Sequence, residues 1–181
     1  LLTLWNTYSF FVSYANIDGY KPGTAFKGKR PEIDRWLLSE LNALVVKVTD
    51  ELEGFDPTDA ARAIETFVDD LSNWYVRRSR RRFWRGASEG DDDKQSAYDT
   101  LYMALVTVSK LIAPFTPFVA EELYRNLVVS QDPAAPVSVH LAIWPGADPA
   151  LIDESLNAET QLVKRVCSLG RAARAKAQIK V

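Results

Sequence analysis

A run of arginines flanked by aromatic residues is the part of this sequence whose residue types could do chemistry. The segment from Asn73 to Trp84 reads Asn-Trp-Tyr-Val-Arg-Arg-Ser-Arg-Arg-Arg-Phe-Trp and contains no acid. A guanidinium group keeps its charge and pairs bidentately with phosphate, and Trp rings stack on unpaired bases. The segment therefore predicts contacts with a nucleic acid, made by Asn73, Trp74, Arg77, Arg78, Arg80, Arg81, Arg82, Trp84 and Arg85.

A second basic stretch lies near the end of the chain. From Gln161 onward the sequence has six bases and no acid. The net charge of the whole chain is −2, so local patches rather than total charge would attract a polyanion. We expect four residues of this stretch to form a second phosphate-binding rail: Lys164, Arg165, Arg171 and Arg174.

Two of the arginines conflict with the helical pattern that precedes them. Helical spacing extended from Leu71 places Arg78 and Arg82 on the buried face. An apolar core does not accept unpaired arginines. They either pair with internal acids, for which Asp91–Asp93 and Glu121–Glu122 are the candidates, or dock onto another domain. Trp84 is open to two interpretations, a stacking platform or a core residue, whereas Tyr75 is expected in the core.

The sequence lacks the residue sets that catalysis usually requires. One cysteine (Cys167) and one histidine (His140) cannot build a four-ligand zinc site, and no Gly-rich phosphate loop is present. We therefore expect no catalytic site, no metal and no cofactor in this chain. No apolar run is long enough to cross a membrane, and no signal peptide is visible. The single cysteine fits a reducing compartment, the cytoplasm.

Apolar residues at three- and four-residue steps predict helices along most of the chain. The expected helices cover residues 1–12, about 31–54, 56 through the arginine segment, 93–112, 118–127, and about 149 into the 170s. Residues 137–144 alternate loosely and are expected to be extended, lying across the helices. The pattern indicates an all-α bundle of about five to six helices. We expect the bundle to span residues 1–147 and a basic helix, with an apolar face at Leu156, Val163, Val166 and Leu169, to span 148–181.

Several segments resemble class I aminoacyl-tRNA synthetases for aliphatic amino acids. The arginine segment, preceded by Leu71 and Ser72, is similar to that of the isoleucyl-tRNA synthetase family. Further similarity lies in Asp34 to Asn42, Leu111 to Tyr124 (with Pro-Phe-Thr-Pro-Phe), Ser138 to Leu141, Trp144-Pro145, Leu4 to Tyr8 and Tyr14 to Gly19. The similarity covers essentially the whole chain.

The resemblance implies an anticodon-binding helical domain that packs against the anticodon stem and loop of isoleucine tRNA. It implies a longer parent, and the first residue, Leu1, also suggests a piece of one. The parent would be a monomer that uses ATP with magnesium, with room for a structural zinc elsewhere. Its catalytic domain would be a partner of this one in the same polypeptide, and no membrane would be involved. The alternatives are an interdomain scaffold without anticodon contact and the same domain of a valyl or leucyl relative.

Overall fold

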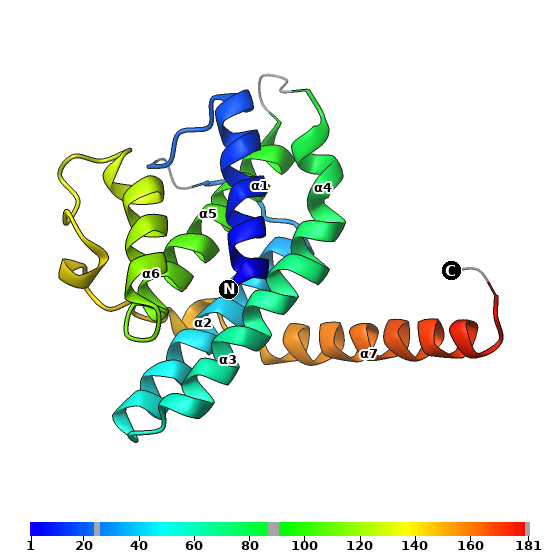
Figure 1. The fold of residues 1–181 in the computed structure, drawn as a ribbon. Coiled ribbons are helices and arrows are strands. Elements are labelled where there is room, and N and C mark those ends of the chain that lie inside the picture. Colours follow the sequence, from blue (N-terminus) through cyan, green and yellow to red (C-terminus); the bar gives the residue numbers. More distant parts are fainter. Residues whose placement is uncertain (24–25, 87–90, 180–181) are drawn as a thin grey trace.

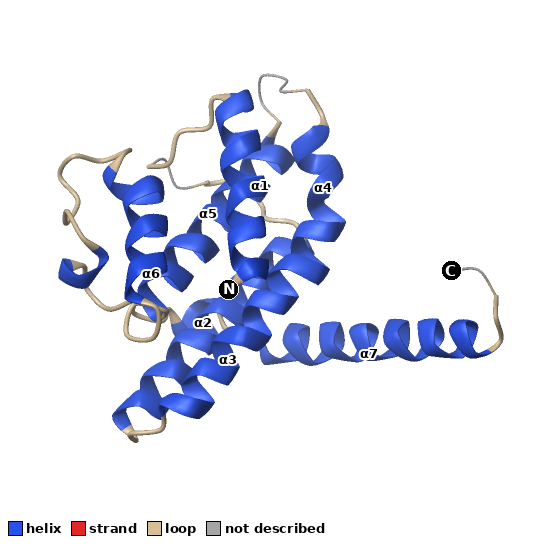
Figure 2. Ribbon diagram, in the orientation of Figure 1, coloured by secondary structure: helices blue, strands red, loops and turns tan. Residues whose placement is uncertain are grey.

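The computed structural model describes residues 1–23, 26–86 and 91–179, and all regular structure within these ranges is helical (Figure 2). The prediction of an all-α bundle is confirmed. The α-helices are α1 (Leu2–Asp18), α2 (Glu32–Glu53), α3 (Pro57–Asp70), α4 (Arg77–Trp84), α5 (Asp92–Leu111), α6 (Pro117–Tyr124) and α7 (Glu154–Lys176). A π-helical segment, η1 (Leu71–Val76), joins α3 to α4, and another, η2 (Arg125–Val129), follows α6.

Aspartate side chains begin three of these helices by accepting hydrogen bonds from free backbone amides. Asp56 accepts from two amides at the start of α3, as its place before Pro57 predicts. Asp153 accepts from one amide, that of Leu156, at the start of α7. The fourth helix of the sequence pattern, α5, is capped by Asp91 rather than by Asp93. Asp93, where the sequence pattern predicts this helix to begin, lies in its first turn, and its carboxylate pairs with arginines.

The core is formed where α2, α3 and α5 pack together, with α1, α4 and α6 around them (Figure 1). Its most deeply buried side chains, all inaccessible to solvent, include Leu37, Leu71, Tyr75, Leu101, Leu105 and Leu111. The predicted core position of Tyr75 is confirmed. α4 continues in the direction of α3. The arginine segment therefore lies at one end of the bundle.

The π-helical segment η1 changes which arginines face inward. A π turn takes in one extra residue, so the positions after it rotate by about one residue relative to a straight α-helix. Beyond Leu71 the buried positions are Tyr75, Val76, Ser79 and Phe83. Arg78 is consequently exposed, and the prediction that it lies on the buried face is wrong.

Residues 137–144 also differ from their predicted form. They contain a single 3-10 turn, Val139–Leu141, in place of a continuous extended segment. The chain then crosses α2 as expected, since the Trp144 Nε1 donates to Thr49 Oγ1 at 2.9 Å and the Asp148 amide to Asn42 Oδ1 at 2.7 Å.

The last helix, α7, projects away from the bundle (Figure 1). Leu156 in its first turn is buried, but Val163, Val166 and Leu169 are 52, 60 and 63% exposed. The predicted apolar face therefore exists, yet no described residue covers most of it. Cys167 on α7 is half-buried.

Candidate nucleic-acid interface

Arg82 is held inside the bundle by a buried carboxylate. Its Nη1 and Nη2 donate to the two oxygens of Asp34 at 2.6 and 2.7 Å, a bidentate pair. Its Nη2 also donates to the Asp93 carbonyl, and its Nε lies 2.9 Å from the Asp93 carboxylate. Its side chain is 12% exposed. Of the two alternatives predicted for Arg82, pairing with an internal acid is therefore correct. Docking of this residue onto another domain is contradicted.

The Asp34 carboxylate has further donors from two neighbouring helices. The Tyr75 hydroxyl donates to Oδ1 at 2.8 Å and the Ser96 hydroxyl to Oδ2 at 2.5 Å. Asp34 itself is completely buried. Burial and the Asp34 charge raise the pKa of Tyr75 well above 10. Burial alone would lower the pKa of Arg82, but the bonds and charges of its acidic partners raise it above its ordinary value.

The end of α4 is fixed by a second set of contacts. Arg85 Nη2 pairs with the Asp93 carboxylate at 2.7 Å and lies 3.7 Å from that of Asp91. The buried Lys94 donates to the Arg85 carbonyl and pairs with Asp18 at 2.7 Å. Among the acids proposed from sequence, Asp91 and Asp93 therefore take part. Glu121 and Glu122 do not, because they bond Ser138 and Asn126.

Arg78 lies over the Trp74 ring, with its guanidinium carbon 3.0 Å from the ring centre. Its Nη1 also donates to the Trp74 carbonyl at 3.4 Å. Partial burial lowers the pKa of Arg78, and the neighbouring charges of Arg171 and Arg77 lower it further, against an opposing effect of Cys167. Arg78 therefore lies near α7 and stacks on Trp74, although its side chain remains exposed.

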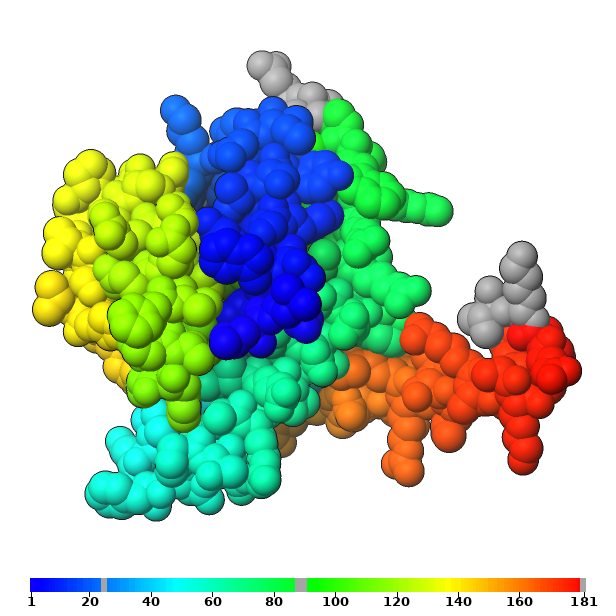
Figure 3. Space-filling model, in the orientation of Figure 1, coloured from blue at the N-terminus to red at the C-terminus, as the bar shows by residue number. Residues whose placement is uncertain are grey.

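The remaining arginines of the segment point outward. Arg77, Arg80 and Arg81 are exposed, and their side chains form no ion pair or hydrogen bond with the rest of the described chain. Trp84 is 56% exposed, which rules out the core interpretation and leaves its ring open to stacking. Asn73 is exposed as well. Figure 3 shows side chains of the α4 segment standing out on the side toward which α7 extends.

The basic residues of α7 do not form one rail. At 3.6 residues per turn, Arg171 is about 20° from Lys164 and about 60° from Arg174, whereas Arg165 is about 120° from Arg171. Lys164 pairs with Asp70 of α3, and its Nζ lies 5.7 Å from the centre of the Trp36 ring. Arg165, Arg171 and Arg174 are exposed. The structure brings Arg171 close to the arginine segment and turns Arg165 to the other side of the helix.

Asp34 is the residue of this region that sequence reasoning missed. A signal was present, because Asp34 is in step with Leu37, Leu41 and Val48 on the apolar face of α2. An acid at a core position requires a partner. The partner could not be found by spacing, since Arg82 is 48 residues away from Asp34 in the sequence.

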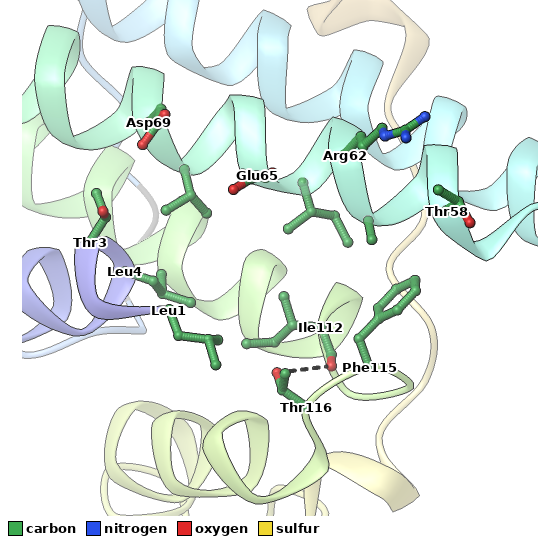
Figure 4. Close-up of a pocket in the computed structure, with 13 residues that line it drawn as sticks. Leu1, Thr3, Leu4, Thr58, Arg62, Glu65, Asp69, Ile112, Phe115 and Thr116 are labelled. Atoms are coloured by element: carbon green, nitrogen blue, oxygen red, sulfur yellow. Dashed lines mark hydrogen bonds between the residues drawn. The ribbon is translucent and has the colours of Figure 1, made fainter.

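Outside the arginine segment and α7, the surface includes a pocket with a mainly apolar lining. A pocket of about 430 Å³ lies between the start of α1, α3 and the α5–α6 turn, with an apolar floor and a rim of Arg62, Glu65 and Asp69 (Figure 4). No cluster of three or more metal-ligating side chains occurs in the described ranges. None of the described helices is both long and apolar enough to span a bilayer.

Comparison with known proteins identifies the family. Residues 34–181 match the model of the anticodon-binding domain of tRNA ligase. The whole chain is 63% identical to an isoleucine–tRNA ligase of Dehalococcoides mccartyi, of which it covers 18%. Isoleucine–tRNA ligases of Thermus thermophilus and Clostridium novyi are 56 and 48% identical over 99% of the chain, which spans 17% of each.

The chain therefore spans less than a fifth of the length of these relatives. The family match covers α2 to the end of the chain, including the arginine segment, η1 and α7. With a helical bundle that presents exposed arginines at one end, the fold agrees with that match, and the chain belongs to the family of tRNA ligase anticodon-binding domains.

Proposed function

We propose that this chain is the anticodon-binding domain of an isoleucine–tRNA ligase and that it holds isoleucine tRNA at the anticodon stem and loop. The identity to isoleucine–tRNA ligases along the whole chain supports this specificity over that of a valyl or leucyl relative. In the parent, activation of isoleucine with ATP and magnesium would take place elsewhere in the same polypeptide. We further propose that the parent acts in the cytoplasm as a monomer.

One observation carries the proposal: the arginine segment is divided into paired and unpaired members. Arg82 and Arg85 are neutralised by acids within the bundle. Arg77, Arg80 and Arg81 are exposed and lack a partner among the described residues. Phosphate is the ligand that such unpaired guanidinium groups bind most readily. These three residues would contact phosphates, and Arg171 of α7 would add a fourth cation near Arg78.

The exposed Trp84 offers an aromatic ring, which phosphate binding alone does not require. Aromatic faces stack on unpaired bases at about 1–3 kcal/mol per base, and an anticodon loop presents such bases. Trp84 is the last residue of α4, three residues after Arg81, so a strand held by the exposed arginines would pass its ring. Phosphate contacts position an RNA, whereas contacts with bases specify it.

The experiment measures binding of the full-length protein to isoleucine tRNA and to the same tRNA with an exchanged anticodon. We expect tighter binding of the cognate tRNA and an affinity that falls steeply with salt, because phosphate contacts release counterions. Replacement of Trp84 by Ala should reduce the difference between the two tRNAs, and replacement of the exposed Phe118 by Ala is the control. Equal binding of both tRNAs would leave only a scaffold function.

A further inference from the structure

Asp34 is placed to control the orientation of the arginine segment without touching a ligand. Its carboxylate is completely buried and receives four hydrogen bonds, from Arg82 (two), Tyr75 and Ser96. These donors lie on α4, η1 and α5, so one side chain of α2 joins three other elements. No other buried carboxylate in the described ranges bonds to an arginine of α4.

Because of the π turn, α4 needs a contact that fixes its rotation about the helix axis. Because η1 rotates all later residues, the face that α4 presents is not set by the straight continuation of α3. Phe83 packs edge-on against Tyr98 and Phe10, with ring centres 4.9 and 5.2 Å apart. Apolar packing of a ring tolerates small rotations, and the Arg85–Asp93 pair at the end of α4 is solvent-exposed. The buried bidentate pair of Arg82 with Asp34 has one planar geometry and is the more rigid contact.

We propose that Asp34 is a positioning residue for RNA binding: through Arg82 it fixes the rotation of α4 so that Arg77, Arg80 and Arg81 meet the phosphates together. This inference rests on the proposed function, since it assumes that these three arginines bind tRNA. Arg82 then has a structural role within the arginine segment, and its charge contributes nothing directly to phosphate binding.

The chain supplies a matched control in a second buried ion pair. Asp99 on α5 pairs with Arg30, and the Arg30 Nη1 donates to Thr100 at 2.7 Å. Asp99 is 6% exposed, so the pair is buried to a similar degree. It joins α5 to the chain that precedes α2, and within the described ranges neither side chain bonds to α4. Loss of either pair should destabilise the fold, but only loss of the Asp34 pair should turn α4.

The test compares Asp34→Asn and Asp99→Asn in the full-length protein. We expect Asp34→Asn to weaken isoleucine tRNA binding about tenfold, a size typical of residues that act without touching the ligand. The slope of log affinity against log salt should fall by about one for each phosphate that the turned α4 no longer reaches. Asp99→Asn should lower the thermal midpoint comparably and leave affinity and slope unchanged. Equal effects of the two variants on binding would overturn the proposal.

A double variant separates positioning from stability and covers the case in which Asp34→Asn does not fold. Asp34→Leu with Arg82→Met replaces the pair by apolar groups, which is often neutral or stabilising. The Tyr75 and Ser96 hydroxyls lose Asp34 as acceptor, but the Tyr75 hydroxyl keeps the Ala97 carbonyl at 3.5 Å. We expect the double variant to fold and yet to bind tRNA more weakly than the wild type does. Amide exchange in residues 77–85 should be faster than in the wild type. Wild-type affinity and salt slope in the double variant would contradict the proposal.

The triple variant Arg77→Ala, Arg80→Ala and Arg81→Ala distinguishes failure of the inference from failure of the proposed function. If the triple variant loses tRNA affinity but Asp34→Asn does not, the inference alone is wrong. If the triple variant binds tRNA as well as the wild type does, the proposed function of the arginine segment is wrong, and the inference fails with it.

Discussion

Arg78 and Trp74 form a stacked pair on the surface of the arginine segment, with the guanidinium carbon 3.0 Å from the ring centre. The two residues are one helical turn apart, whereas Arg82 of the same segment faces inward and Arg77 is exposed. One run of like charges therefore contains three environments: an ion pair, an aromatic stack and open solvent. Each environment leads to a different expected response to mutation.

The stack between Arg78 and Trp74 should contribute a small, measurable coupling free energy. A cation over a Trp ring at a partly exposed site is worth about 0.5–1 kcal/mol. We expect a double-mutant cycle with Arg78→Ala and Trp74→Ala, read from urea unfolding, to give a coupling of that size. Strict additivity of the two single variants would show that the stack does not contribute to stability.

Removal of Arg82 should destabilise the fold far more than removal of its neighbour Arg81. Arg82→Ala leaves the buried Asp34 without its cation, which costs about 3–5 kcal/mol in comparable buried pairs. Arg81→Ala removes an exposed charge, and the free energy of unfolding should change by less than about 0.5 kcal/mol. Denaturant unfolding of the two variants measures the difference. Similar losses of stability in both would contradict the assignment of Arg82 to the interior.

Glu121 should make part of the stability dependent on pH. Its Oε2 accepts from Ser138 Oγ at 2.8 Å and from the Val139 amide at 2.9 Å, which ties α6 to the 3-10 turn. Slight burial would raise the pKa of Glu121, but these bonds outweigh it and lower the pKa below 4.5. The resulting stability is fully present above the unfolded-state value and is lost as the pH falls through the lowered folded value.

Glu121→Gln tests this pH dependence. The thermal midpoint of the variant should lie below that of the wild type at pH 7. The difference between the two should shrink as the pH falls below 4.5, the ordinary value for a glutamate. A constant difference between about pH 7 and about pH 3 would show that the charge of Glu121 plays no part.

The outer part of α7 should be the least protected helical segment among the described residues. Beyond Leu156 the Lys164–Asp70 pair joins α7 to the bundle, and the apolar residues Val166 and Leu169 are exposed. Helical stability comes mainly from packing of an apolar face. We expect amide exchange in residues 165–176 to be much faster than in α5. Protection equal to that of α5 would mean that the apolar face is covered in solution.

The helices themselves could be predicted from sequence because each buries a face with regular spacing. The stripe that includes Ile64, Phe67 and Leu71 predicts α3 correctly, and Asp56 predicts its start. What failed was the direction of Arg78, since the extra residue of the π turn moves the buried face from Arg78 to Ser79. The exposed face of α7 could not be predicted either, because an apolar stripe does not show whether a partner covers it.

The division within the arginine segment could be predicted only in part: spacing placed Arg82 inward correctly and Arg78 inward wrongly. Six arginines in nine residues indicate a phosphate-binding surface, but each has the same chemistry until its neighbours are known. Asp34 and Asp93 reach Arg82 from two different helices, and such contacts depend on the tertiary arrangement. The sequence therefore identified the arginine segment. The structure shows which of its arginines have no internal acid as partner within the described ranges.

The salt dependence of tRNA binding by the full-length protein tests the central claim most directly. The variant Arg77→Ala, Arg80→Ala and Arg81→Ala is compared with a control that removes three exposed charges elsewhere, Lys47→Ala, Arg62→Ala and Arg125→Ala. We predict that the first variant lowers the slope of log affinity against log salt by about two to three, whereas the control leaves it near the wild-type value. A slope that is unchanged in the first variant, or reduced equally in both, would contradict phosphate binding by the exposed arginines of α4.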